Sequence, residues 1–83
     1  MICMINEDAT GIIAGQYNLN RWHKYKGAVT WESHSVYFGH EIFRSRWKDT
    51  GRHTSMYAAM HGDVLLLGGS LDDIRRVIRE VKE

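Results

Sequence analysis

Five histidines are the residues of this sequence best suited to bind a metal ion or to transfer protons near neutral pH. They are His23, His34, His40, His53 and His61. Their spacings of 11, 6, 13 and 8 match no standard zinc pattern, and the sequence has no His-x-x-x-His pair of the kind that binds zinc from one helix. A site made from His34, His40 and either Glu32 or Glu41 would need a bent strand. The sequence therefore predicts solvated or hydrogen-bonded histidines, with no metal and no cofactor.

Catalytic groups are not indicated elsewhere in the chain. The run Ser33–Ser35 places a histidine between two hydroxyls, but a catalytic triad requires facing side chains and an orienting carboxylate. Gly68 and Gly69 precede a predicted helix whose first turn carries Asp72 and Asp73, and these carboxylates would repel a phosphate. We therefore expect a protein that is not an enzyme.

Positive charge is concentrated in the middle of the chain. The 83 residues include 11 Lys and Arg and 10 Asp and Glu, giving a net charge of +1. Residues 21–53 alone carry seven of the cations, three of the acids and all three tryptophans. A locally cationic, aromatic-rich segment predicts a surface that binds a partner. The predicted partner-binding residues are Arg21, Trp22, Lys24, Lys26, Arg44, Arg46, Lys48 and Arg52.

Two classes of partner fit this composition. Trp, Tyr, Arg and Met are enriched at protein interfaces, which favours a protein-binding regulator or inhibitor that recognises an acidic surface of a host protein. Small accessory proteins of phages and plasmids are of this type, and a homodimer fits as well. The alternative is a nucleic-acid-binding protein that uses a basic sheet face, although such domains usually have a pI above roughly 9. The pI of this chain is 8.0.

A C-terminal helix over residues 71–82 is the clearest predicted element. Its apolar residues recur every three or four positions, and Ser70 can cap its first turn. Upstream, residues 55–60 and 64–67 flank His61-Gly62-Asp63, which predicts a β-hairpin.

Three further segments favour strands, namely residues 25–31, 36–38 and 42–48, with a bulge or bend at Gly39. Together, the predicted strands and helix indicate a single α+β domain over residues 1–83, in which an antiparallel β-meander of four to five strands packs against one C-terminal α-helix.

Alternation along the strands predicts one apolar and one basic sheet face. Val29, Trp31, Phe43 and Trp47 would lie under the helix, and the opposite, uncovered face would present Lys24, Lys26, Arg44, Arg46 and Lys48. If those cations are only a solvated face, the functional surface moves to three arginines of the helix, Arg75, Arg76 and Arg79.

The first 16 residues predict either a short edge strand or a weakly ordered arm. Their apolar run, residues 1–5, is too short for a signal peptide or a membrane span. Cys3 is the only cysteine, so the chain can form no internal disulfide and no cysteine-based zinc site. We expect an inert thiol, a cytoplasmic protein and no contact with a membrane.

Overall fold

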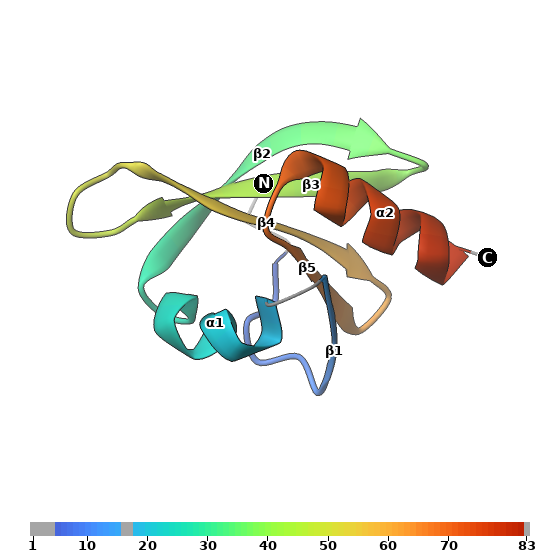
Figure 1. Cartoon of the computed structure of the whole chain (residues 1–83), viewed down its shortest axis with the longest axis horizontal. Coiled ribbons are helices and arrows are strands. Elements are labelled where there is room, and N and C mark those ends of the chain that lie inside the picture. Colours follow the sequence, from blue (N-terminus) through green and yellow to red (C-terminus); the bar gives the residue numbers. More distant parts are fainter. Residues whose placement is uncertain (1–4, 16–17, 83) are drawn as a thin grey trace.

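The computed structural model describes residues 5–15 and 18–82, so Cys3 lies outside the described residues. The elements within this part are β1 (Gly11–Ala14), α1 (Asn18–Tyr25), β2 (Val29–Tyr37), β3 (His40–Trp47), β4 (His53–His61), β5 (Val64–Gly68) and α2 (Leu71–Lys82). The strands form one sheet in the order β1-β5-β4-β3-β2 (Figure 1). Strands β2 to β5 are an antiparallel meander, which confirms the predicted α+β fold.

Helix α2 matches its prediction in extent, cap and buried face. The Asp73 N–H donates to Ser70 Oγ at 3.1 Å, which satisfies one of the free donors of the first turn. Ile74, Val77 and Ile78 are buried on the sheet. They form one core cluster with Ile42, Ala59 and Leu66.

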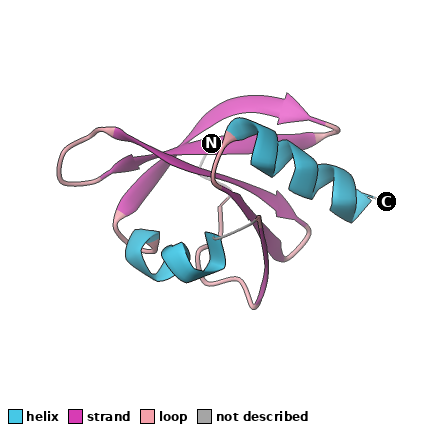
Figure 2. Ribbon diagram, in the orientation of Figure 1, coloured by secondary structure: helices cyan, strands magenta, loops and turns pink. Residues whose placement is uncertain are grey.

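The second sheet face is also covered, contrary to the expectation of an open sheet. Trp22 and Tyr25 of α1 are buried in a second cluster that includes Val29, Leu65 and Leu67. Trp31 and Trp47 pack against this cluster, so the tryptophan face lies under α1 and not under α2. Figure 2 shows the two helices on opposite sides of the sheet.

The last residue of α1 and the turn that follows it replace the first half of a predicted strand. Residues 25–31 were expected to be extended, but the strand begins only at Val29. Gly27 has a φ of +77°, a left-handed conformation that commonly ends a helix. The N–H of Lys26 donates to the Trp22 carbonyl and that of Ala28 to the Tyr25 carbonyl, which closes the last turn.

The hairpin turns depend on residues with positive φ. The predicted β4–β5 hairpin is confirmed, with Gly62 at φ +61° in its turn. Of the two alternatives for Gly39, a bulge or a bend, the bend is found: Gly39 is the second residue of the β2–β3 turn, with Phe38 before it at φ +49°. The register shift in β2 lies instead between Ser33 and Ser35.

Strand β1 forms the edge of the sheet and runs parallel to β5. Gly11 is in register with Val64, and the Gly15 N–H donates to the Leu67 carbonyl at 2.8 Å. Of the two alternatives for the first 16 residues, the edge strand is the one found for residues 11–14.

We expect Ile74→Ala to lower the free energy of unfolding by about 2–5 kcal/mol, because Ile74 is fully buried between α2 and the sheet. Glu80→Ala on the same helix removes an exposed side chain and should cost less than about 1 kcal/mol. Urea denaturation of both variants measures the difference. Equal midpoints for the two variants would contradict the packing of α2 on the sheet.

Gly68→Ala should destabilise the protein by about 1–3 kcal/mol, since a Cβ at position 68 would lie 2.5 Å from the backbone nitrogen of Ile74. The control is Gly11→Ala, whose Cβ would meet only the Val64 side chain, at 3.3 Å. Thermal unfolding of the two variants tests whether β5 and α2 approach this closely. A Gly68→Ala variant as stable as the control would show that they do not.

Candidate functional site

The predicted partner-binding residues do not form one surface. Trp22 is only 3% exposed and belongs to the core, so it is unavailable for a partner. Arg21 and Lys24 are exposed on α1, Lys26 follows that helix, and Lys48 lies in the turn after β3. Arg52 is exposed just before β4. Arg44 and Arg46 lie on the other side of the sheet, on the face that α2 partly covers. The prediction that the basic residues share one uncovered sheet face is therefore wrong.

Acidic groups of the N-terminal segment accompany the cations near α1. Lys26 Nζ lies 3.3 Å from Asp8 Oδ1. The Glu7 carboxylate accepts hydrogen bonds from the Gly27 N–H at 2.9 Å and from Trp31 Nε1 at 2.8 Å. These carboxylates reduce the positive charge of this end of the molecule.

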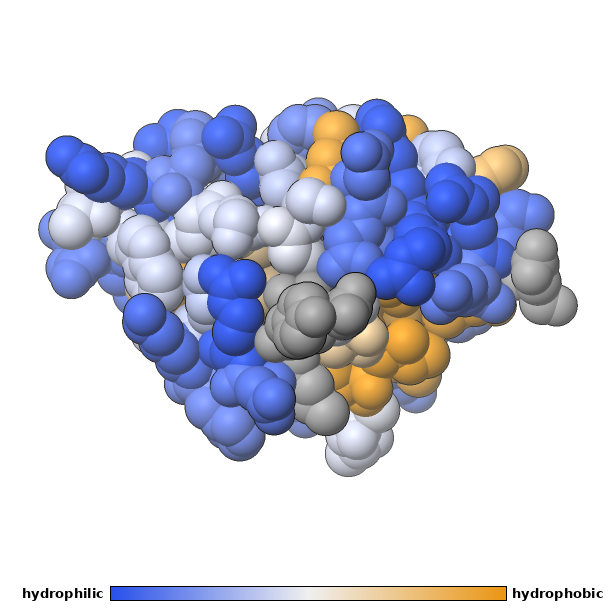
Figure 3. Space-filling view, viewed as in Figure 1, coloured by the Kyte–Doolittle hydropathy of each residue, from blue (hydrophilic) through white to orange (hydrophobic). Residues whose placement is uncertain are grey.

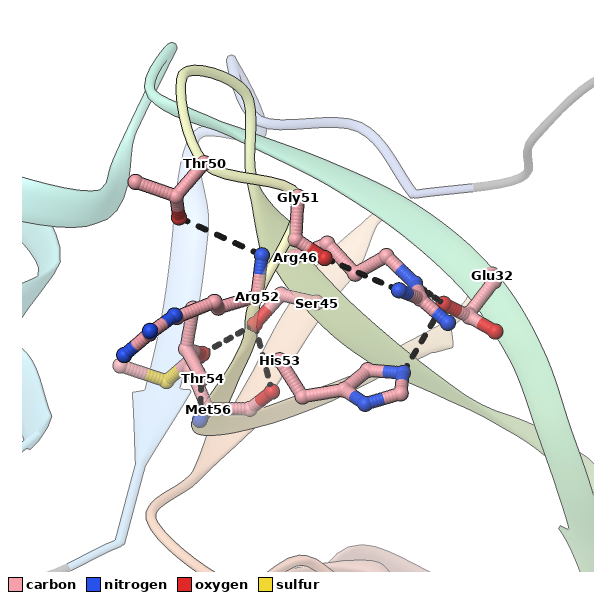
Figure 4. A network of polar contacts seen from close by, with 9 residues as sticks. All are labelled: Glu32, Ser45, Arg46, Thr50, Gly51, Arg52, His53, Thr54 and Met56. Carbon is pink, nitrogen blue, oxygen red and sulfur yellow. Dashed lines mark hydrogen bonds and ion pairs between the residues drawn. The ribbon is translucent and has the colours of Figure 1, made fainter.

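Arg46 belongs to a polar network, and its side chain is 45% exposed (Figure 4). Its Nε donates to Glu32 Oε1 at 2.5 Å, and its Nη1 donates to the Gly51 carbonyl at 2.9 Å. His53 Nε2 lies 3.3 Å from the same Glu32 oxygen. Beneath this group, Ser45 bonds with Thr54 Oγ1 and donates to the Met56 carbonyl. The network joins β2, β3, β4 and the β3–β4 turn, which makes Arg46 a structural residue.

The pKa of the Glu32 carboxyl lies below its ordinary value of 4.5. The main cause is the hydrogen bond from Arg46; partial desolvation opposes it, and the charge of Arg46 and the contact with His53 add to the lowering. Glu32 therefore remains a carboxylate throughout the neutral range and does not act as a proton donor there.

Three cations of α2 lie beside two aromatic residues of the β2–β3 hairpin. Arg79 Nη1 donates to Tyr37 Oη at 2.9 Å, and the Arg75 guanidinium lies 5.6 Å from the centre of the Tyr37 ring. Lys82 Nζ lies 4.6 Å from the centre of the Phe38 ring. We call Tyr37, Phe38, Arg75, Arg79 and Lys82 the hairpin–helix surface.

No acidic side chain of the described residues forms an ion pair with Arg75, Arg79 or Lys82. Arg76 differs from these residues, because it pairs with Asp73 at 2.5 Å and with Glu80 at 3.3 Å. On one side of α2, Asp73 and Glu80 neutralise the charge of Arg76. On the other side, no ion pair within the described residues neutralises the charges of Arg75, Arg79 and Lys82. The sequence predicted Arg75, Arg76 and Arg79 as the alternative functional surface. Arg75 and Arg79 do belong to the hairpin–helix surface, but the sequence could not show that Arg76 is paired with acidic residues instead.

Two arginines, Arg75 of this surface and Arg44 of β3, have a buried nitrogen that makes no hydrogen bond in the described part of the chain. In both residues this nitrogen is Nε. Arg44 is in register with Tyr57, which packs against the core under α2.

The histidines do not converge on a metal or a nucleophile. His40 Nε2 lies 2.9 Å from His61 Nδ1, whereas His34 contacts Ser35 Oγ and the Tyr57 ring. Ser33 donates to Glu41 instead of His34. Among the described residues, no group of three or more His, Cys, Asp or Glu could hold a metal ion.

A second apolar area lies beneath α2, over β1 and β5 (Figure 3). Ile13 of β1 is 41% exposed and is in register with Leu66, which lies on the α2 side of the sheet. Strand β1 has the sequence GIIA and brings no charged group to this area. The hairpin–helix surface is therefore the better candidate, because it combines exposed aromatic area with charge.

The Glu32 network predicts a specific pH dependence of stability. Because its pKa is lower in the folded chain, Glu32 stabilises the fold above its ordinary pKa of 4.5 and loses this effect as the pH falls through the lower value. The gap in unfolding free energy between wild type and Glu32→Gln should be constant above about pH 5 and close at lower pH. Urea denaturation between pH 7 and pH 3 measures it. The unfolding free energy of the Arg46→Gln/Glu32→Gln double variant should change with pH in the same way as that of Glu32→Gln. A difference between wild type and Glu32→Gln that does not depend on pH would contradict the network.

Comparison with known proteins identifies no relative of this chain. No protein-family model matches it, and no curated protein and no solved structure is significantly similar to it. Over the residues described, no helix has the length and apolar character needed to cross a membrane. The hairpin–helix surface and its surroundings are therefore the features that indicate a function.

Proposed function

We propose that this chain is a small non-catalytic binding protein that docks its hairpin–helix surface against an acidic surface of another protein. One observation carries the proposal: Arg75, Arg79 and Lys82 have no acidic partner among the described residues. Arg75 and Arg79 contact Tyr37, and Lys82 contacts the exposed Phe38 next to it. Aromatic residues and arginine are the side chains most enriched in the energetic centres of protein interfaces.

The exposed cations of α2 favour a partner that brings carboxylates. Arg79 and Lys82 are exposed on α2. A carboxylate can accept two parallel hydrogen bonds from one guanidinium, and such charge-assisted bonds are about twice as strong as neutral ones. Docking an acidic surface would therefore add charge-assisted hydrogen bonds to the exposed Arg79.

The same surface suits a nucleic acid less well. Base stacking needs exposed aromatic rings along a cationic groove, but Trp22 is buried and Trp31 and Trp47 pack against the α1 core. The net charge of the chain is only +1, and Asp73 and Glu80 hold Arg76 on the neighbouring side of α2. Nucleic-acid binding is therefore the alternative that the experiment must separate from protein binding.

The role that we propose is that of a regulator or inhibitor in the cytoplasm, of the accessory type carried by phages and plasmids. A single cysteine permits no internal disulfide, which suits a reducing compartment. A homodimer through the hairpin–helix surface is disfavoured, because two-fold symmetry would place Arg75, Arg79 and Lys82 against the same cations of the second copy.

The test is affinity capture of partners from a lysate of the source cell, with and without nuclease, followed by affinity measurement with the purified partner. Arg75→Glu/Arg79→Glu should weaken binding at least about 100-fold, since like charges at a docked interface cost several kcal/mol. Lys24→Glu/Lys26→Glu is the matched control. It makes the same change in net charge on and after α1, and it should bind like wild type.

Three results would contradict the proposal. Capture that disappears with nuclease would indicate a nucleic-acid-binding protein. Equal losses in the two double variants would show that only net charge matters. The absence of any captured protein under both conditions would remove protein binding as the function. Circular dichroism of each variant must match that of wild type, so that a loss of binding is not a loss of fold.

A further inference from the structure

The β2–β3 turn places an aromatic residue where the backbone favours glycine or asparagine. Tyr37 and His40 are paired, and the two residues between them, Phe38 and Gly39, have φ values of +49° and +75°. Two positive φ values in a two-residue hairpin turn indicate type I′, whose first position is usually Asn, Asp or Gly. A phenylalanine in the left-handed region is an outlier that costs conformational energy.

The packing of Phe38 does not account for its presence. Its side chain is 54% exposed, and it lies outside both core clusters. Its ring makes an edge contact with Tyr37 at 4.6 Å between centroids and lies under the Lys82 ammonium. Both contacts are on the surface, so neither the turn nor the core requires an aromatic side chain at this position.

The position of Phe38 matches that of a binding residue. Figure 1 shows the β2–β3 turn beside the C-terminal half of α2. Arg79 and Arg75 hold Tyr37, the preceding residue, and Lys82 contacts Phe38 itself. The tip of the hairpin is thus an apolar side chain in contact with Lys82, and two more cations hold the tyrosine before it. Figure 3 shows apolar atoms at this end of the hairpin next to the hydrophilic side chains of α2.

We propose that Phe38 inserts into an apolar pocket of a partner protein whose rim is acidic. This inference rests on the proposed function and names the chemistry of the partner site. The pocket would bury the exposed part of the ring, and carboxylates at its rim would meet Arg75, Arg79 and Lys82. Backbone strain kept at an exposed position, without any gain in the core, is typical of a residue retained for binding.

Phe38→Asn separates binding from folding. This change gives the turn the Asn-Gly dipeptide that type I′ turns prefer, so the thermal midpoint should equal or exceed that of wild type. Affinity for the partner protein captured in the experiment above should fall about tenfold or more, because the change removes an aromatic anchor. Phe38→Tyr keeps the ring and should bind within about threefold of wild type.

Val36→Thr is the matched control. Val36 is 68% exposed and is in register with Glu41, on the face of the hairpin opposite to Tyr37. Threonine has nearly the same shape and also favours a strand, so this variant removes exposed apolar area without touching the hairpin–helix surface. Its affinity should equal that of wild type.

Each other outcome would overturn the inference. A lower midpoint for Phe38→Asn would show that Phe38 supports the fold. Unchanged affinity of that variant, with binding lost in Arg75→Glu/Arg79→Glu, would leave the proposed function intact and exclude the apolar pocket. Binding of wild type to phosphatidylcholine–phosphatidylglycerol vesicles, absent in Phe38→Asn, would indicate a membrane in place of a protein. If the capture experiment yields no protein partner, the proposed function and this inference fail together.

Discussion

Burial of strand β5 on both faces is the constraint on which the fold depends. Leu66 points toward α2, and Leu65 and Leu67 point toward α1, and all three are fully buried. Neither helix alone could exclude water from this strand. The sheet must therefore be the middle layer of three. Strand β2, at the opposite edge of the sheet from β1, is the strand farthest from β5, and several of its residues are exposed.

Local sequence patterns predicted the second half of the chain well. The apolar spacing and Ser70 defined α2, and His61-Gly62-Asp63 defined the β4–β5 hairpin. Helix α1 was missed because it has eight residues, and Tyr25 was assigned to the following strand. The continuous run from Val64 to Leu67 was the signal for a second covering layer, because strands buried on both faces do not alternate. The parallel pairing of β1 with β5 has no local pattern at all.

The candidate site was harder to predict, because neighbouring groups decide what each cation can do. Arg44 and Arg46 share a strand and a face, but Glu32 and the Gly51 carbonyl hold Arg46, whereas Arg44 has an unsatisfied donor. Arg75 and Arg76 are adjacent in sequence, and one faces Tyr37 while the other pairs with Asp73. Charge counts along the chain located the basic middle segment, but they could not show that Trp22 is buried or that the helix cations meet the hairpin.

The parallel β1–β5 pair also affects when the protein can fold during its synthesis. Gly11 leaves the ribosome early, but its partner in the sheet, Val64, is 53 positions later in the sequence. Until β5 is available, β1 has no neighbour, and the α1 side of the core lacks Leu65 and Leu67. Contacts so distant in sequence slow folding, because the chain loses loop entropy before it gains the contact. The sheet can therefore close only after most of the chain has been made, and a nascent chain that stalls before β5 exposes Ile12 and Ile13 to the cell.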